Sequence, residues 1–405
     1  MPSPYDKAND RIFYACQLVG IGPQGGSNAP TIAHGVQSIG ITTNFNLEQA
    51  FELGQIQIYE NIEGLPDVEV TMEKVLDGYP LLYHLASPDA TSNGLVGRSK
   101  ERCDLYLGIY SDAFDAVTDG SQDKPQVEVK CSGAYLGNVS YTIPVDGNAT
   151  ESITLVGNHK EWLTNQSSMK LESDQTEVLG GHQNIDGADV PLAMSGFSGG
   201  IQRREDVILE RCVLPKDIYG ISAVAWNTTD DTSDNTIIES GNAYNFATEQ
   251  PRVHLQNVSI STDFSREDIL ELGRKAPYYR ATSFPIEVSC EIEAIAISGD
   301  FVGAYEVGDP ALFSDEAASG NNTQESRIVI SLRDRTTFDL GKKNRLSSVS
   351  YGGGDATGGN VSITYSYTNF NDLDVLHRKD PASTAGGGDM NYAPGQSGMM
   401  GMPPT

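Results

Sequence analysis

The amino-acid sequence predicts a mainly β protein built from two tandem copies of one β-sandwich or barrel domain, each with a short flanking helix. Two observations predict it. A 19-residue segment recurs 219 residues further along the chain, and the segments that follow each copy alternate apolar and polar residues. A period of two is typical of half-buried strands. The chain's 405 residues are enough for two or three ordinary domains.

The internal repeat is clearest between residues 36–54 and 255–273. These segments read VQSIGITTNFNLEQAFELG and LQNVSISTDFSREDILELG, and eight of the 19 positions are identical. Three further matches follow in the same order: Val68–Glu73 with Ile286–Glu291, Leu136–Tyr141 with Leu346–Tyr351, and Ser152–Thr154 with Ser362–Thr364. The preserved order predicts a duplicated domain.

A short helix is predicted after the first strand of each copy. In the second copy Ser265 fits the N-cap and Gly273 the C-terminal end, and in the first copy Asn46 and Gly54 hold the same positions. A helix of about two turns is unstable alone. We therefore expect it to lie against a sheet.

The strand after this helix alternates strictly in both copies, with apolar residues at the inward positions. We expect the outward positions to place five acids on one exposed face: Glu69, Glu73, Glu287, Glu291 and Glu293. An ordinary solvated strand face gives the same pattern. The alternation by itself therefore leaves both interpretations open.

The repeat divides the chain into five parts. We expect an N-terminal arm over residues 1–35, the first copy over 36–160, a connecting or inserted segment over 161–250, the second copy over 251–377, and a flexible tail over 378–405. The tail is rich in Gly, Pro and Met and lacks periodicity, which is typical of a segment that orders only against a neighbour.

Composition limits the classes of function. The formal net charge is −28, which argues against tight binding to a nucleic-acid backbone, because such binding needs clustered Lys and Arg. No run approaches the ~18 apolar residues of a membrane span, and residues 1–10 carry no apolar run of signal-peptide type. We expect a protein made and kept in a cytoplasm-like compartment, without membrane contact.

The cysteines predict neither a disulfide framework nor a metal site. They are odd in number, form no C-x-x-C pair and have no histidine at metal-binding spacing. We expect buried, reduced thiols and no cofactor. The five residues are Cys16, Cys103, Cys131, Cys212 and Cys290.

Three motifs resemble catalytic or ligand-binding motifs, but each lacks a feature that its function requires. Residues 196–200 fit G-x-S-x-G around Ser198, but the alternating β/α surroundings of a nucleophile elbow are missing. Residues 230–235 resemble a calcium loop without the Gly and Glu that an EF-hand requires. Residues 352–359 are rich in Gly but lack the Lys of a phosphate loop. No catalytic or metal-binding residue is predicted.

Three segments of the second copy resemble virion structural proteins of tailed phages. They are residues 264–273 (FSREDILELG), 277–280 (PYYR) and 284–288 (FPIEV). The duplicated plan is similar to that of tail tube proteins with two tube domains per chain, and the resemblance covers most of residues 30–160 and 250–377. It implies β-sandwich or small barrel domains, six of which close a ring through shared inner strands.

The resemblance also implies a function and partners. Three chains would form a pseudo-hexameric ring, and stacked rings would form a tube in the virion tail, after synthesis in the host cytoplasm. Partners would be further copies of the chain and other tail proteins: baseplate, terminator, sheath or tape measure. DNA would pass without tight binding, and the five acids would line the lumen, because an acidic wall does not hold a polyanion.

Two alternatives stay open. A baseplate or tail-completion ring, or a capsid decoration protein, would share duplicated β domains. A serine hydrolase that uses Ser198 belongs to a different class and would be recognised by labelling with a fluorophosphonate probe.

Overall fold

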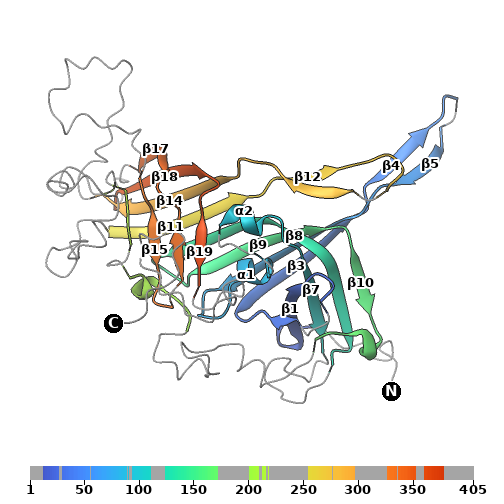
Figure 1. Ribbon diagram of the computed structural model, residues 1–405, viewed down its shortest axis with the longest axis horizontal. Helices are drawn as coiled ribbons and strands as arrows, with labels where there is room; N and C mark the ends of the chain where they lie inside the picture. Colours follow the sequence, from blue (N-terminus) through green and yellow to red (C-terminus); the bar gives the residue numbers. More distant parts are fainter. Residues whose placement is uncertain are drawn as a thin grey trace.

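The computed structural model describes residues 12–26, 30–54, 56–88, 90, 94–110, 124–171, 200–208, 212–215, 218, 254–275, 277–296, 326–334, 336–352 and 360–377. Within these ranges the fold is mainly β, as the sequence predicts, and the paired strands are antiparallel. Figure 1 shows one broad sheet that runs through the molecule, with shorter elements against it.

The central sheet contains strands from both halves of the chain in the order β3-β6-β9-β8-β11-β14-β18-β17. The first half supplies β3, β6, β9 and β8, and the second half supplies β11, β14, β18 and β17 in the same pairing order. The pairing of β8 with β11 joins them. The bounds are β3 (Val36–Asn44), β6 (Asp67–Val75), β9 (Thr150–Gly157), β8 (Val127–Pro144), β11 (His254–Asp263), β14 (Glu287–Ile295), β18 (Ser362–Phe370) and β17 (Arg345–Gly352).

Bulges recur at matching places in the two halves. The register shifts at Gln37 in β3 and at Gln256 in β11, and it shifts at Gly137 in β8 and at Ser347 in β17. A bulge is a specific local feature of a strand. These repeated bulges therefore match β3 with β11 and β8 with β17, residue by residue.

The pairing corrects two matches of the sequence comparison. In one of them, Ser152–Thr154 corresponds to Thr364–Ser366 rather than to Ser362–Thr364. Ile41 lies opposite Val70, and its counterpart Ile260 lies opposite Cys290. Val70 thus corresponds to Cys290, whereas the sequence comparison had matched it with Val288. A slip of two residues keeps each side chain on the same face of a strand, which is why alternation alone did not reveal it.

The predicted helices at residues 46–54 and 265–273 are wrong, because both segments form β-hairpins. β4 (Leu47–Phe51) pairs with β5 (Ile58–Glu63), and β12 (Arg266–Ile269) pairs with β13 (Tyr279–Thr282). A short helix has few internal hydrogen bonds and is marginal in water. The downstream partner strand supplies a hydrogen-bonded ladder instead, so tertiary pairing overrides the local helix signals.

The residues expected to begin these helices form turns. Asn46 and Ser265 have φ of 47° and 40°, a region that few residues other than Gly adopt. Their N–H groups donate to the side chains of Asn44 (3.1 Å) and Asp263 (2.8 Å). Such local bonds favour turns as well as helix caps, so the same residues fit both interpretations.

Two short helices lie against the first half, outside the predicted segments: α1 (Leu82–Leu85) and α2 (Leu95–Arg98). The carboxylate of Glu151 accepts hydrogen bonds from the N–H groups of Leu82 (2.6 Å) and Tyr83 (3.0 Å) and from the hydroxyl of Tyr141 (3.0 Å). Burial raises the pKa of Glu151. The remaining helical turns are 3-10: η1 (Tyr14–Cys16), η2 (Gln166–Ser168) and η4 (Arg204–Asp206).

Further strands form smaller layers against the central sheet. The first part of β8 pairs with β7 (Cys103–Ile109) and β10 (Lys160–Leu163). β7 pairs with β1 (Gln17–Pro23), which pairs with β2 (Thr31–Ile32), so residues expected as an N-terminal arm belong to this sheet. In the second half β15 (Val329–Ser331), β16 (Thr337–Asp339) and β19 (Asp374–Leu376) form a three-stranded sheet.

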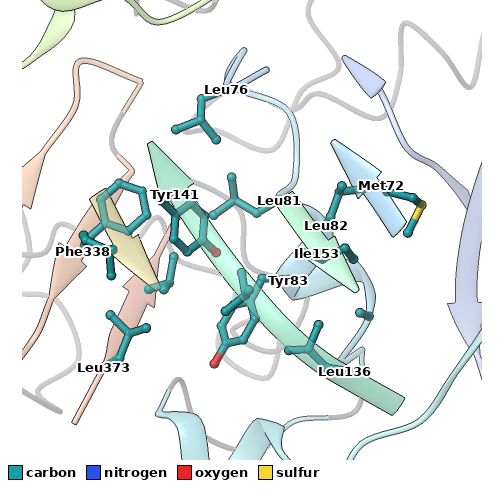
Figure 2. Close-up of a cluster of buried hydrophobic side chains, with 14 of the residues drawn as sticks. Met72, Leu76, Leu81, Leu82, Tyr83, Leu136, Tyr141, Ile153, Phe338 and Leu373 are labelled. Carbon is teal, nitrogen blue, oxygen red and sulfur yellow. The ribbon is translucent and has the colours of Figure 1, made fainter. Parts of the chain in front are cut away.

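One hydrophobic core extends through both halves. Figure 2 shows Tyr141 of β8 beside Phe338 of β16, with Tyr83 and Ile153 close by. The ring centroids of Tyr141 and Phe338 are 4.5 Å apart. Burial of each such side chain contributes roughly 1.5–3 kcal/mol. The two halves are therefore held together by side-chain packing as well as by strand pairing.

The cysteines are free thiols, and four of the five are buried. Burial raises the pKa of Cys103 and of Cys290 to about 12. Since the thiolate is the reactive form, these two side chains act as small apolar groups of the core.

A buried carboxyl in this core gives a prediction about pH. Asp334 accepts hydrogen bonds from the N–H and hydroxyl of Thr336 (both 2.9 Å), and burial raises its pKa to about 6 from 3.8. The folded chain holds this proton to a higher pH than the unfolded chain does. The group's contribution to stability is therefore present at acidic pH and is lost, by roughly 3 kcal/mol, as pH rises from about 4 to about 6.

We expect Asp334→Asn to remove this part of the pH dependence, since Asn does not titrate. Urea unfolding of both proteins across this pH range measures the difference, and the comparison of slopes is independent of any uniform loss of stability in the variant. Parallel stability curves for the two proteins would contradict the assignment.

Candidate functional site: an exposed acidic sheet face and two edge strands

The outward face of the central sheet carries acids on its interior strands, and it carries a base, Arg345, on the edge strand β17. The predicted alternation is confirmed in β6 and β14, where apolar residues are buried and the residues between them are exposed or half-buried. On β6, β9, β11, β14, β18 and the second part of β8, the outward positions hold no Lys or Arg and are otherwise mostly Ser and Thr. The acids among them are Asp67, Glu69, Glu73, Asp263, Glu287, Glu291 and Glu293.

The five predicted glutamates all lie on this face, in two groups. Glu73 lies between Ser38 and Ser152 of the neighbouring strands, and Glu291 lies between Ser259 and Ser366. Such neutral partners leave the carboxylates to be solvated by water. The result is a face of hydroxyl and carboxylate groups that repels anions.

The strand pairing changes which acids correspond between the halves. It matches Glu73 with Glu293 and Asp67 with Glu287, whereas the sequence comparison matched Glu69 with Glu287. Asp67 differs from the others because Arg280 of β13 approaches it, with 3.7 Å between Nη2 and Oδ1. We therefore treat Glu73 and Glu293 as the best matched pair of free-standing acids.

The central sheet ends in two edge strands. In the described part of the chain, β3 pairs with β6 and β17 pairs with β18, whereas the interior strands pair on both sides. Ile260 of β11 and Val139 of β8 are each 1% exposed, but their counterparts Ile41 of β3 and Val349 of β17 are only partly buried. Edge strands with unfilled hydrogen bonds and half-covered apolar residues are ready to pair with another chain.

The β8–β11 junction buries a phenylalanine whose counterpart is exposed. Phe264 follows β11 and is 0% exposed, and its N–H donates to the carbonyl of Gly137 (2.9 Å). Phe45 holds the equivalent position after β3 and is 62% exposed. Phe45 and Phe264 are identical in the sequence repeat, so the sequence does not distinguish the covered residue from the exposed one.

An arginine fastens the second hairpin to the first half. Arg266 donates to the carbonyl oxygens of Leu136 (2.7 and 2.9 Å) and Ser99 (2.6 Å), and its guanidinium carbon lies 4.9 Å from the ring centroid of Tyr135. Burial lowers the pKa of Arg266 to about 10, so it stays charged at neutral pH. Leu47 holds the equivalent position in the first hairpin and is 62% exposed.

Both hairpins extend from the same end of the central sheet, and the β4–β5 hairpin reaches well beyond the rest of the chain (Figure 1). They carry large apolar side chains that are exposed. Contiguous exposed apolar surface marks interaction sites in soluble proteins. The exposed residues are Phe51, Leu53, Ile56, Tyr59, Ile269, Leu270, Leu272 and Tyr278.

The chemical motifs fall largely outside this site. Ser198, residues 230–235 and residues 353–359 lie outside the described residues. Among the residues that the structure does describe, no group of three or more His, Cys, Asp or Glu side chains could hold a metal ion. The described helices are also too short to cross a membrane.

No family model matches the chain, and no curated protein matches it. Among solved structures it is similar to a chain of the sheath-tube complex of an extracellular contractile injection system, at 12% identity and a TM-score of 0.29. It is also similar to the tube-terminating cap of the anti-feeding prophage, at 14% and 0.28. Each likeness covers 41% of this chain and 100% of the other.

A third likeness is to the virion of a native gene transfer agent particle, at 12% identity and a TM-score of 0.20, covering 30% of this chain and 85% of the other. Likenesses of this strength do not identify a function. The function is therefore inferred from the strands and side chains of the chain itself.

The two equivalent phenylalanines give a matched prediction. We expect Phe264→Ala to lower the free energy of unfolding by about 3–5 kcal/mol, because it leaves a cavity at the junction. Phe45→Ala removes an exposed ring and should change the stability of dilute, unassembled protein by no more than about 0.5 kcal/mol. Urea unfolding measures both, and similar losses in the two variants would show that the junction is not the source of the difference.

Proposed function

We propose that this chain is the repeating structural subunit of a phage-type tail tube. Three chains close a pseudo-hexameric ring, and rings stack around a channel that conducts DNA. One observation carries the proposal: two halves with the same strand order are joined edge to edge in one sheet, and that sheet ends in two edge strands. A sheet built by repetition can be continued by the next chain, and closure into a ring removes its edges.

The duplication of one domain is part of this proposal. It is supported by the shared pairing order, by the recurring bulges, and by the equivalent turns at Asn46 and Ser265. A chain with two equivalent halves needs half as many copies for a ring. Three chains therefore supply the six domains that the resemblance implies.

The acidic face supports the role of the channel wall. DNA carries one negative charge per ~1.7 Å of its axis, so a basic wall would retain it by counterion release. A wall of hydroxyl groups and unpaired carboxylates offers no such contact. We assign Glu69, Glu73, Glu287, Glu291 and Glu293 to this wall, and the opposite, apolar face of the sheet to the domain cores.

The two hairpins support stacking. They project from one end of the sheet and expose apolar side chains that a monomer would leave in water. In a tube they would contact the adjacent ring and bury these residues. The protein would then reside in the virion tail, with other copies of itself and other tail proteins as partners.

A terminal ring of the tail, or a capsid decoration protein, would use the same edge strands without stacking. The exposed hairpins favour the tube, because a ring that never stacks would leave them uncovered.

Electron microscopy of the purified protein tests the assembly. We expect hollow tubes of stacked rings, with three-fold symmetry by chain and nearly six-fold symmetry by domain. Single rings that never stack would favour the terminal-ring alternative. Monomers at all concentrations would contradict self-assembly.

A charge reversal tests the channel wall. We expect tubes of Glu73→Lys/Glu293→Lys to retain short duplex DNA at low salt, at least ~10-fold more than wild-type tubes, and to release it as salt rises. Co-sedimentation of labelled DNA with tubes measures this. Asp146→Lys/Glu205→Lys is the control, because it makes the same charge change at exposed positions outside the strands of the central sheet. Equal retention by both variants would contradict the assignment of the face.

A further inference from the structure

The structure contains a template for the contact between chains, namely the β8–β11 junction. β3 corresponds to β11 and β17 corresponds to β8, through their order in the sheet and their bulges. The two edge strands are thus the two sides of a second junction of the same kind. In one chain these sides lie at opposite ends of the sheet, so they cannot meet there.

The template fixes a register. Within the chain, Ile260 lies opposite Tyr141. By the bulge correspondence, Ile41 is equivalent to Ile260 and Tyr351 is equivalent to Tyr141. Ile41 and Tyr351 would therefore be partners across the boundary between chains.

We propose that β17 of one chain pairs antiparallel with β3 of the next, with Ile41 opposite Tyr351 and Thr43 opposite Val349. This inference rests on the proposed function, since it specifies how the ring closes. The contact is heterologous, because the two edges are different surfaces, and repeated head-to-tail contacts of this kind give a ring when the rotation closes.

The exposure of Phe45 fits this contact. In the template the Phe264 ring is fully covered and its N–H donates to Gly137 at the β8 bulge. In the second junction the N–H of Phe45 would donate to the carbonyl of Ser347, which is the equivalent bulge residue of β17. The neighbouring chain would then cover a ring that is 62% exposed in the single chain.

The two junctions differ in one charged contact. Arg266 lies over Tyr135 within the chain, whereas the equivalent positions hold Leu47 on the first hairpin and Arg345 on β17. The arginine is therefore on the hairpin in the junction within the chain and on the strand in the junction between chains. The alkyl part of Arg345 can cover Leu47, so the junction between chains is similar in shape but has a different hydrogen-bond pattern.

An engineered pair of cysteines tests the register between β17 and β3 directly. In the template, Phe264 donates to Gly137 and Val145 donates to the carbonyl of Gln256. Since hydrogen-bonded and non-hydrogen-bonded pairs alternate, Ser261 and Ser140 form a non-hydrogen-bonded pair, with Cα atoms ~4.5 Å apart. This spacing suits a disulfide.

The equivalent residues between chains are Thr42 and Ser350, and both are exposed on the outward face. We expect Thr42→Cys/Ser350→Cys to form covalent dimers and trimers in assembled, oxidised protein, as seen on non-reducing gels. Thr42→Cys/Ser348→Cys is the register control, because diagonal neighbours lie ~7–8 Å apart, and it should cross-link at least ~10-fold more slowly. Ser140→Cys/Ser261→Cys should close within single chains, which checks the template.

The outcomes separate the proposals. Tubes in which the Ser348 pair cross-links faster than the Ser350 pair would overturn the register. Tubes in which neither pair cross-links would overturn the edge pairing while leaving the tube intact. Wild-type chains that never assemble would overturn the tube itself, and this pairing with it.

A second variant tests the same contact without cysteines. We expect Phe45→Ala to raise the protein concentration needed for assembly by about tenfold or more, because the ring it removes is buried only between chains. Tyr14→Ala is the matched control, since Tyr14 is 89% exposed on η1, outside the central sheet. An unchanged assembly threshold for Phe45→Ala would overturn the proposed burial of this ring.

Discussion

The antiparallel pairing of β8 with β11 is the interaction on which the rest of the structure depends. It turns two similar halves into one continuous sheet, so that the apolar faces of both halves share a core and the polar faces form one surface. It also buries Phe264 and engages Arg266. Without this pairing the strands of the two halves would form two separate sheets, each with two exposed edges.

The same pairing explains the edges of the molecule. A junction used once between equivalent halves leaves one copy of each side unused, and these are β3 and β17. Isolated edge strands promote uncontrolled association. A chain that ends in two complementary edges offers each edge a partner on a further copy of itself, which relates the fold to the proposed assembly by one physical constraint.

The strands and their exposed faces could be predicted from the sequence, whereas the hairpins and the burial of Phe264 could not. Alternation identified β6 and β14 and the faces of their glutamates, because period two survives in any half-buried strand. The hairpins were mistaken for helices, because Asn46 and Ser265 suit a helix cap and a turn equally well. The difference between Phe45 and Phe264 arises because Phe264 meets Gly137 of β8, which is distant in the sequence, and such long-range contacts leave no local signal.

A cryo-electron microscopy map of the assembled protein, at a resolution that separates strands, tests the central claim most directly. We expect the strand beside β3 to be β17 of the neighbouring chain, in a sheet that continues around the ring without a gap. A map in which β3 faces solvent, or pairs with any other segment, would contradict it.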